Sequence, residues 1–294
     1  APTADGGRVK ASPLARKLAA DRGLDLAAIQ GTGPAGRVVQ RDIEAAGTAA
    51  PAAARAPVPA FQPQVSGEPF RDVPLTQIRK TIAKRLAQSI GPIPTFYLTT
   101  EIDMTRVVEA REALNAIGEG PKVSLNDITI KAVALALRQH PMCNAWWQDD
   151  HIRLWNEVHI GMAVAIDEGL ITPVIRHADQ KPLRQIAAES KDLAGRARER
   201  RLTPEEYTGS TFSVSNLGML DIDEFTAIIN PPEAGILAIG RVTERPVVID
   251  GVIDSRRTMR ITMSCDHRII DGATGARFLQ TLTRMMENPL ALVW

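Results

Sequence analysis

Hydrophobic residues recur at helical spacing in several parts of the chain. Ile78, Ile82, Leu86 and Ile90 follow one another every four positions, which predicts an amphipathic helix that Thr76 caps. Caps and apolar spacing predict further helices from Thr105 through Leu114, from Ser124 or Asn126 to just before Pro141, from about Pro182 to Arg201, and after Gly272.

Other segments show the pattern of strands. From Met259 to Cys265 apolar and polar residues alternate strictly, which is the period of a strand. Asp250-Gly251 stands between two apolar runs and predicts a hairpin. Further strands are predicted at 96–102, 158–166, 170–176, 211–218 and 235–242. Strands and helices mix without strict βαβ order, so the predicted fold class is α+β with a mixed sheet.

An Ala- and Pro-rich stretch divides the chain. Between Gly47 and Gly67 the only charged residue is Arg55, a composition typical of an extended linker. We therefore expect a linker remnant at 1–7, a small helical domain at 8–46, a flexible linker at 47–69 and a large domain at 70–294. In the small domain Ser12 is the expected cap of a helix that ends at Gly23.

Composition excludes several classes of function. The 35 basic and 34 acidic residues leave a net charge of +1, which does not favour nucleic acid as the main partner. No apolar run approaches the ~20 residues of a membrane span. Cys143 and Cys265 are far apart, so neither a disulfide framework nor a zinc knuckle is expected, and a reducing compartment fits best.

A histidine, an aspartate and a serine are the candidates for chemistry. His267 follows the strand 259–265, and an imidazole suits proton transfer near neutrality. Asp271 could orient the ring, hold the loop by an ion pair with an arginine, or merely cap the next helix. Ser215 and Ser213 share the hydroxyl-bearing side of the strand 211–218, where a hydroxyl can stabilise an oxyanion. Taken singly, each of these residues is more commonly structural.

Three stretches together resemble a known family. DHRIIDG around His267, FSVSNLG around Ser215 and INPPEAGILAIG at 229–240 resemble the catalytic domain of dihydrolipoamide acyltransferases, the core components of 2-oxo acid dehydrogenase complexes. The small segment resembles their peripheral subunit-binding domain. This resemblance implies a chloramphenicol acetyltransferase-like catalytic domain with a mixed sheet, preceded by a small all-α domain.

The resemblance also implies roles for the candidate residues. His267 would take the proton from the thiol of coenzyme A or dihydrolipoamide, Ser215 would donate to the tetrahedral oxyanion, and Asp271 would fix the loop around His267. The active site would lie between subunits of a homotrimer that assembles into a core of 24 or 60 chains. Ser215-Asn-Leu-Gly218 is more like the pyruvate-specific members, so acetyl is the expected acyl group.

Alternatives stay open beside this interpretation. They are the core of a branched-chain or other 2-oxo acid complex, a non-catalytic scaffold that binds the dehydrogenase, and a free-standing acyltransferase. The lipoyl group would be supplied by a lipoyl domain, which this chain lacks through truncation or because another subunit provides it. Bacterial cytoplasm and mitochondrial matrix both fit.

Partner binding is expected at the small domain. Arg16, Lys17 and Arg37 resemble the basic patch that binds acidic surfaces of the 2-oxo acid decarboxylase or the dihydrolipoamide dehydrogenase, although such charges are commonly only solubilising. Gly31-x-Gly33-x-x-Gly36 matches the dinucleotide-binding fingerprint but lacks its βαβ unit, so its glycines are expected to permit a tight loop.

The remaining histidines and Cys265 are expected to be structural. No ligand spacing connects His140, His151, His159 and His177, so no metal is predicted. Cys265 lies two residues before His267 on an apolar strand face, which favours a packed thiol over a nucleophile.

Overall fold

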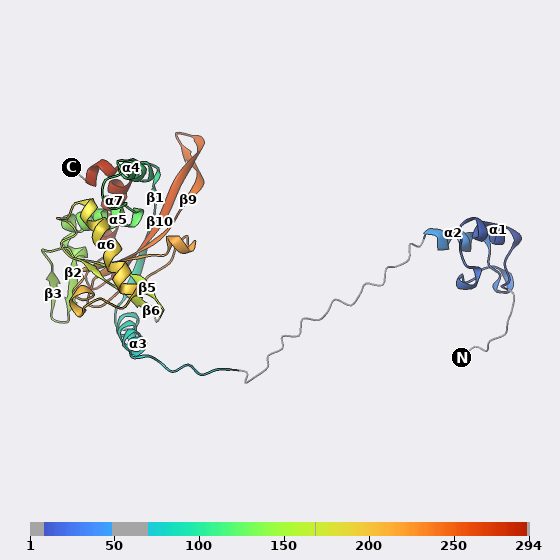
Figure 1. Cartoon of the computed structure of the whole chain (residues 1–294), viewed down its shortest axis with the longest axis horizontal. Helices are drawn as coiled ribbons and strands as arrows, with labels where there is room; N and C mark the ends of the chain where they lie inside the picture. Colours follow the sequence, from blue (N-terminus) through green and yellow to red (C-terminus); the bar gives the residue numbers. More distant parts are fainter. Residues whose placement is uncertain (1–8, 49–69, 168, 293–294) are drawn as a thin grey trace. The chain divides into compact units, whose positions relative to one another are not determined.

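The computed structural model describes residues 9–48, 70–167 and 169–292, and the chain divides into two compact units after Asp72. The predicted linker remnant at 1–7 and residues 49–69 of the predicted linker lie outside the described residues. The small unit contains the helices α1 (Pro13–Asp21) and α2 (Gln40–Thr48), with single 3-10 turns at Leu26–Ala28 and Pro34–Gly36 between them (Figure 1). As predicted, the Ser12 side chain caps α1 by accepting from the Ala15 N–H.

The glycine-rich segment of the small unit is a tight loop held by a carboxylate. A Cβ at Gly31 would lie 2.5 Å from the carbonyl carbon of Arg37, so only glycine fits the close approach. The carboxylate of Asp42 accepts hydrogen bonds from the Thr32 N–H, the Thr32 hydroxyl and the Val39 N–H. These bonds, above all that from the hydroxyl, lower the pKa of Asp42. The segment follows a 3-10 turn and not a strand, which confirms the predicted tight loop.

The large unit is built on a six-stranded mixed sheet, which confirms the predicted fold class. Its strand order is β1-β10-β9-β8-β4-β7. The strands are β1 (Thr95–Asp103), β10 (Val252–Asp266), β9 (Gly235–Ile249), β8 (Phe212–Asn216), β4 (Ile160–Met162) and β7 (Val174–Ile175). The pairs β9–β8 and β8–β4 are parallel, and the other pairs are antiparallel. The predicted Asp250-Gly251 hairpin joins β9 to β10, and it extends from the body of this unit in Figure 1.

Five α-helices, two small hairpins and short 3-10 turns surround the sheet in the described part of the large unit. The 3-10 turns are Pro141–Cys143, Pro204–Glu206, Gly218–Leu220 and Pro289–Leu292. The helices are α3 (Gln77–Ile90), α4 (Thr105–Ala116), α5 (Leu125–Gln139), α6 (Leu183–Arg198) and α7 (Gly272–Glu287). The hairpins pair β2 (Ala145–Gln148) with β3 (His151–Leu154) and β5 (Val164–Ile166) with β6 (Gly169–Ile171). None of the helices described has the length and hydrophobicity that a membrane-spanning segment needs.

Two long strands that the sequence predicted, 158–166 and 170–176, are each broken. The first divides into β4 and β5, and the second into β6 and β7, which belong to different sheets. The break lies where the Met162 N–H donates to the Pro173 carbonyl and the Ala163 N–H donates to the Val214 carbonyl. Pro173 has no N–H to continue a ladder, so one continuous hairpin cannot form there.

Aromatic packing joins the C-terminal helix to the sheet. Phe212 on β8 and Phe278 on α7 are both fully buried, and their ring centroids lie 5.7 Å apart. The helix α5 lies over the same core and is buried along most of its length. The strand that carries Ser215 is thereby packed against the helix that follows His267.

Replacing Phe278 by alanine should therefore lower the free energy of unfolding by about 3–5 kcal/mol, because a large cavity remains between α7 and β8. Denaturant unfolding of the large unit measures the change. The control is Ile117→Ala, at a side chain of the large unit that is 65% exposed, with an expected change within about 0.5 kcal/mol. Equal losses in the two variants would show that this contact does not hold the core.

Candidate active site

His267 is the first residue after β10, as the strand pattern predicted. Its backbone N–H donates to the Pro94 carbonyl at 3.0 Å, and its side chain is exposed. The imidazole packs against the ring of Phe96 on the neighbouring strand β1, with the centroids 4.7 Å apart. The ring is thus held on one side and open to a reactant on the other.

A buried ion pair fixes the backbone on either side of His267. Asp266 is buried and accepts from the Arg268 Nε at 2.9 Å and from the Arg268 Nη2 at 2.7 Å. The guanidinium of Arg268 also lies 4.4 Å above the ring of Trp147 on β2. Sequence reasoning missed this pair, although the charged residues flanking the histidine in Asp-His-Arg were its signal. A carboxylate at a buried strand end requires a partner.

Asp271 is the N-cap of α7. Its carboxylate accepts from the Thr274 N–H at 2.6 Å, and that bond is the main reason that the pKa of Asp271 is lowered. No hydrogen bond joins Asp271 to His267 in the described structure. Of the three alternatives for Asp271, the helix cap is the one observed, and among the described residues Asp271 forms no ion pair with an arginine. Asp266 holds the arginine instead.

Ser215 lies on β8 and is the more accessible of the two candidate serines. Phe212 and Val214 on the same strand are buried in the core. Ser213 is 1% exposed, and its Oγ lies 2.9 Å from where a Cβ on Gly161 of β4 would be, so this hydroxyl faces a closed interior. Ser215 is 8% exposed, and its hydroxyl makes no hydrogen bond to any residue that the structure describes.

The sheet keeps Ser215 and His267 of one chain apart. Ser215 pairs with Ala238 on β9, and Ala238 pairs with Thr262 on β10. Thr262 precedes His267 by five residues, which correspond to about 16 Å along the strand. The distance from β8 to β10 is two strand spacings, about 10 Å, at right angles to that direction. The separation is therefore on the order of 19 Å, too far for both side chains to contact one thioester. The structure of one chain does not bring the two residues together.

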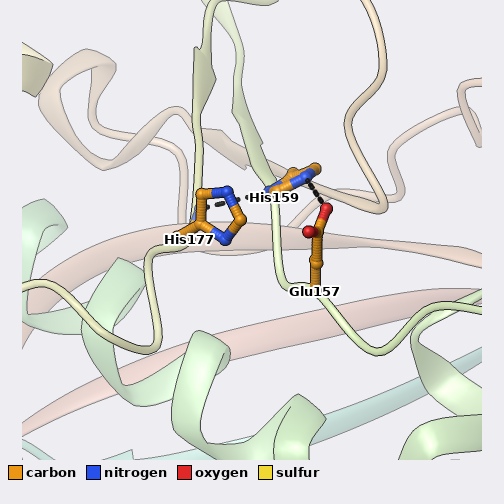
Figure 2. Close-up of side chains that lie close together, drawn as sticks. All are labelled: Glu157, His159 and His177. Carbon is orange, nitrogen blue, oxygen red and sulfur yellow. Dashed lines mark hydrogen bonds and ion pairs between the residues drawn. The ribbon is translucent and has the colours of Figure 1, made fainter.

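A second polar cluster contains two of the histidines that appeared scattered. Figure 2 shows Glu157, His159 and His177, whose possible ligand atoms lie within 4.8 Å of one another. The sequence shows no ligand spacing between His159 and His177, and it is the fold that brings the two side chains together. The backbone N–H of His177 donates to His159 Nδ1 at 3.1 Å, and His159 Nε2 lies 3.0 Å from a Glu157 oxygen.

These hydrogen bonds do not fit a metal site. Because His159 Nδ1 accepts a hydrogen bond from the His177 N–H, Nε2 carries the proton of the neutral ring and donates a hydrogen bond to Glu157. A metal ligand needs a free lone pair at that nitrogen and usually donates from the other one. Burial lowers the pKa of His159, which favours the same neutral form. The cluster therefore ties β4 to the segment after β7, and the absence of a metal stays a prediction.

Comparison with known families identifies the chain. Residues 67–294 match the catalytic domain of the 2-oxoacid dehydrogenases acyltransferase family, and residues 9–44 match the e3 binding domain. The chain belongs to this acyltransferase family. The first match covers the whole sheet of the large unit, and the second covers nearly all of the described small unit.

Individual relatives agree with this assignment. The chain is 46% identical, over 98% of its length, to the dihydrolipoyllysine-residue acetyltransferase component of the mitochondrial pyruvate dehydrogenase complex of Schizosaccharomyces pombe, and it spans 62% of that relative. A crystallised dihydrolipoamide acetyltransferase from Azotobacter vinelandii is 32% identical, with a TM-score of 0.74. The match covers 81% of this chain and 100% of that one. A cubic core of a pyruvate dehydrogenase complex matches with the same TM-score, identity and coverage.

The e3 binding unit of this acyltransferase carries the three predicted basic residues on its surface. Arg16 and Lys17 lie on α1, and Arg37 precedes Val38, whose carbonyl accepts from the Ser12 N–H at 2.9 Å. All three side chains are exposed, and Arg37 lies close to the start of α1. Their role in binding a partner stays a prediction.

The acyltransferase domain buries its cysteines. Cys265 is fully buried, and desolvation raises the pKa of its thiol to about 12. A thiol that stays protonated at neutral pH cannot act as a nucleophile, so the predicted packed role is confirmed.

The Asp266–Arg268 pair should be costly to break. In Arg268→Met the Asp266 carboxylate is left buried without its partner, and we expect the free energy of unfolding to fall by about 3–5 kcal/mol. Chemical denaturation measures it, and Asp266→Asn in the same chain should restore part of the loss. The control is Arg256→Met, whose partner Asp254 is half exposed, with an expected change below about 1 kcal/mol. Similar losses in both single variants would contradict the account.

Proposed function

We propose that this acyltransferase moves an acetyl group between coenzyme A and dihydrolipoamide. The observation that carries the proposal is the placement of His267, an exposed imidazole at a strand end whose two neighbours are fixed by a buried ion pair. Such a base has a defined position and an open side for a thiol. Membership of the family, and the acetyltransferase relatives, support the same chemistry.

His267 acts as the general base of the reaction. It takes the proton from the attacking thiol, and the thiolate adds to the carbonyl carbon of the acyl thioester. The Ser215 hydroxyl donates a hydrogen bond to the oxygen that becomes negative in the tetrahedral intermediate. Collapse of the intermediate breaks the bond to the second sulfur, and that thiolate takes back the proton from the imidazolium. Asp271 supports the loop by capping α7 and makes no proton transfer.

The Azotobacter vinelandii relative supports the choice of residues. A serine, a histidine and an asparagine were studied there for a role in the catalytic mechanism, and they are separated by 52 and four residues. Ser215, His267 and Asp271 have the same two spacings. Aspartate replaces asparagine in this chain, and both residue types cap helices well, which fits a structural role at that position.

The proposed active site lies between two chains of a homotrimer. Because about 19 Å separates Ser215 from His267 within one chain, His267 must meet the Ser215 of a neighbouring subunit. Large apolar side chains exposed on α3 and on the β9–β10 hairpin support further association; they are Ile78, Leu86, Ile90, Val248, Val252 and Ile253. The similarity to a cubic core supports assembly of trimers into a larger particle.

The small unit is proposed to bind a peripheral enzyme of the same complex. The e3 binding match favours dihydrolipoamide dehydrogenase, and the decarboxylase remains the other candidate. Exposed Arg16, Lys17 and Arg37 supply positive charge for an acidic partner surface. The functional division is proposed at 8–46 for this domain and 70–294 for the catalytic one, with 47–69 as the linker.

The substrates arrive from other components. The lipoyl group comes on a lipoyl domain, and coenzyme A comes as a free substrate. Acetyl is preferred over branched-chain acyl groups because of the Ser215-Asn-Leu-Gly218 segment and the relatives that act in pyruvate dehydrogenase complexes. Relatives of both mitochondrial and bacterial origin support a location in the matrix or the bacterial cytoplasm.

Two substitutions test the proposal through the rate of acetyl transfer from acetyl-CoA to free dihydrolipoamide. His267→Ala should lower kcat about 10²- to 10⁴-fold because the general base is lost. Ser215→Ala should lower kcat about 10²- to 10³-fold with little change in KM, because the lost bond acts on the transition state.

The matched control is His151→Ala, at an exposed histidine that binds only Asp150 and should leave the rate unchanged. Assembled protein that transfers no more acetyl than His267→Ala would refute the enzyme and favour a non-catalytic scaffold.

A further inference from the structure

Glu233 is a carboxyl group buried beside the strand that carries Ser215. It lies just before β9 and is 1% exposed. One of its oxygens, Oε1, accepts from the Ser210 hydroxyl at 2.5 Å and from the Asn230 side-chain amide at 2.9 Å. The other oxygen, Oε2, is buried with no hydrogen-bond partner among the described residues. An ionised carboxylate with one unpaired oxygen would be costly in such a place.

The neighbouring hydroxyl of Ser213 is also buried without a partner in the described structure. It lies close enough to the carboxyl for a bond from its hydroxyl to lower the pKa of Glu233, against the larger raising effect of burial. A proton on Oε2 that is donated to Ser213 Oγ would satisfy both groups with a small adjustment of the hydroxyl. The unpaired atoms are thus accounted for by a protonated carboxyl, and burial favours that form over an ionised one.

The surroundings of Glu233 contain no compensating charge. β8 and the 229–234 turn contribute only the hydroxyls and the amide already described, and β2 contributes Trp146, whose indole N–H donates to the Ser210 carbonyl. Just before β4 lies the titratable His159, whose backbone N–H donates to the Thr211 hydroxyl. Burial raises the pKa of Glu233 to about 7. Ionisation near neutral pH thus places an uncompensated charge against β8.

We propose that protonated Glu233 is a positioning residue for Ser215, acting through the hydrogen bond that it accepts from Ser210, just before β8, and through a bond that its proton donates to Ser213 on β8. Ser213 and Ser215 lie on the same side of β8. This role rests on the proposed function, since it concerns the oxyanion donor of that reaction. When Glu233 loses its proton, an uncompensated charge lies against β8, the Ser213 hydroxyl must turn from acceptor to donor, and the alignment of Ser215 weakens.

The sign of the pH dependence follows from the raised pKa. An acid that holds its proton more tightly in the folded protein stabilises that state fully below its ordinary value of 4.5. The contribution declines as the pH rises from there through about 7 and is lost above it. The contribution of Glu233 to the thermal midpoint should therefore decline between about pH 4.5 and pH 7, and kcat should decline as the carboxyl ionises around pH 7.

Glu233→Gln is the decisive variant, because a neutral amide can donate to Ser213 and accept from Ser210 and Asn230. Wild-type kcat for acetyl transfer should fall several-fold between about pH 6.5 and pH 8.5, while KM changes little. In Glu233→Gln kcat should not fall over this range. The control is Glu157→Gln, which alters the partner of His159 and should keep the wild-type decline.

Infrared spectroscopy gives a readout that does not need activity. At about pH 6 ordinary carboxyls are ionised, so the C=O stretch of a protonated carboxyl should be present in wild type, absent from Glu233→Gln, and lost at higher pH. Identical pH profiles in wild type and Glu233→Gln, a flat profile in Glu157→Gln, or a missing band would overturn the role of Glu233. Wild type without any transfer would instead refute the proposed function, and the positioning role with it.

Discussion

The hydrogen-bonded register of β8, β9 and β10 is the constraint on which the rest of the structure depends. It fixes Ser215 opposite Ala238 and Ala238 opposite Thr262, and it leaves His267 five residues farther along β10. A shift of one residue would turn every side chain to the other face of the sheet. The same register that positions the two candidate residues also prevents them from meeting within one chain, so the proposed reaction requires a second subunit.

Burial is used in two ways near these residues. Asp266 is buried, and the guanidinium of Arg268 makes three side-chain hydrogen bonds to it. Glu233 is buried with hydroxyl and amide partners, and burial raises the pKa of its carboxyl to about 7. Burying either carboxyl costs free energy that an apolar residue would not cost. In the proposed reaction each one fixes the position of a neighbouring group, His267 in one case and Ser215 in the other.

Local patterns in the sequence predicted most of the fold and the place of the base. Strict alternation from Met259 to Cys265 predicted the strand end that carries His267, because the alternation of apolar and polar residues can be recognised within one short segment. The strands at 158–166 and 170–176 were predicted as continuous, since hydrophobicity does not reveal that Met162 pairs with Pro173. Asp271 remained ambiguous because a cap and an ion pair require the same residue type.

Contacts between distant segments could not be predicted from spacing. Arg268 contacts Trp147, and His177 contacts His159. The residues of each pair are far apart in the sequence, so the hydrophobic pattern of a short segment cannot predict the contact. The roles of Ser215 and His267 came from the family resemblance of three stretches, and the register then added the separation between them. The resemblance pointed to these residues, and the distance that the register sets between them is the reason for proposing that they act from two chains.

Mixing two inactive variants tests this central claim most directly. His267→Ala and Ser215→Ala chains are coexpressed, and acetyl transfer is measured on the purified mixed assemblies. In a random mixture about one interface in four between neighbouring chains combines an intact His267 with an intact Ser215, so about a quarter of wild-type activity should return. Activity that stays at the level of the separate variants would contradict an active site shared between chains.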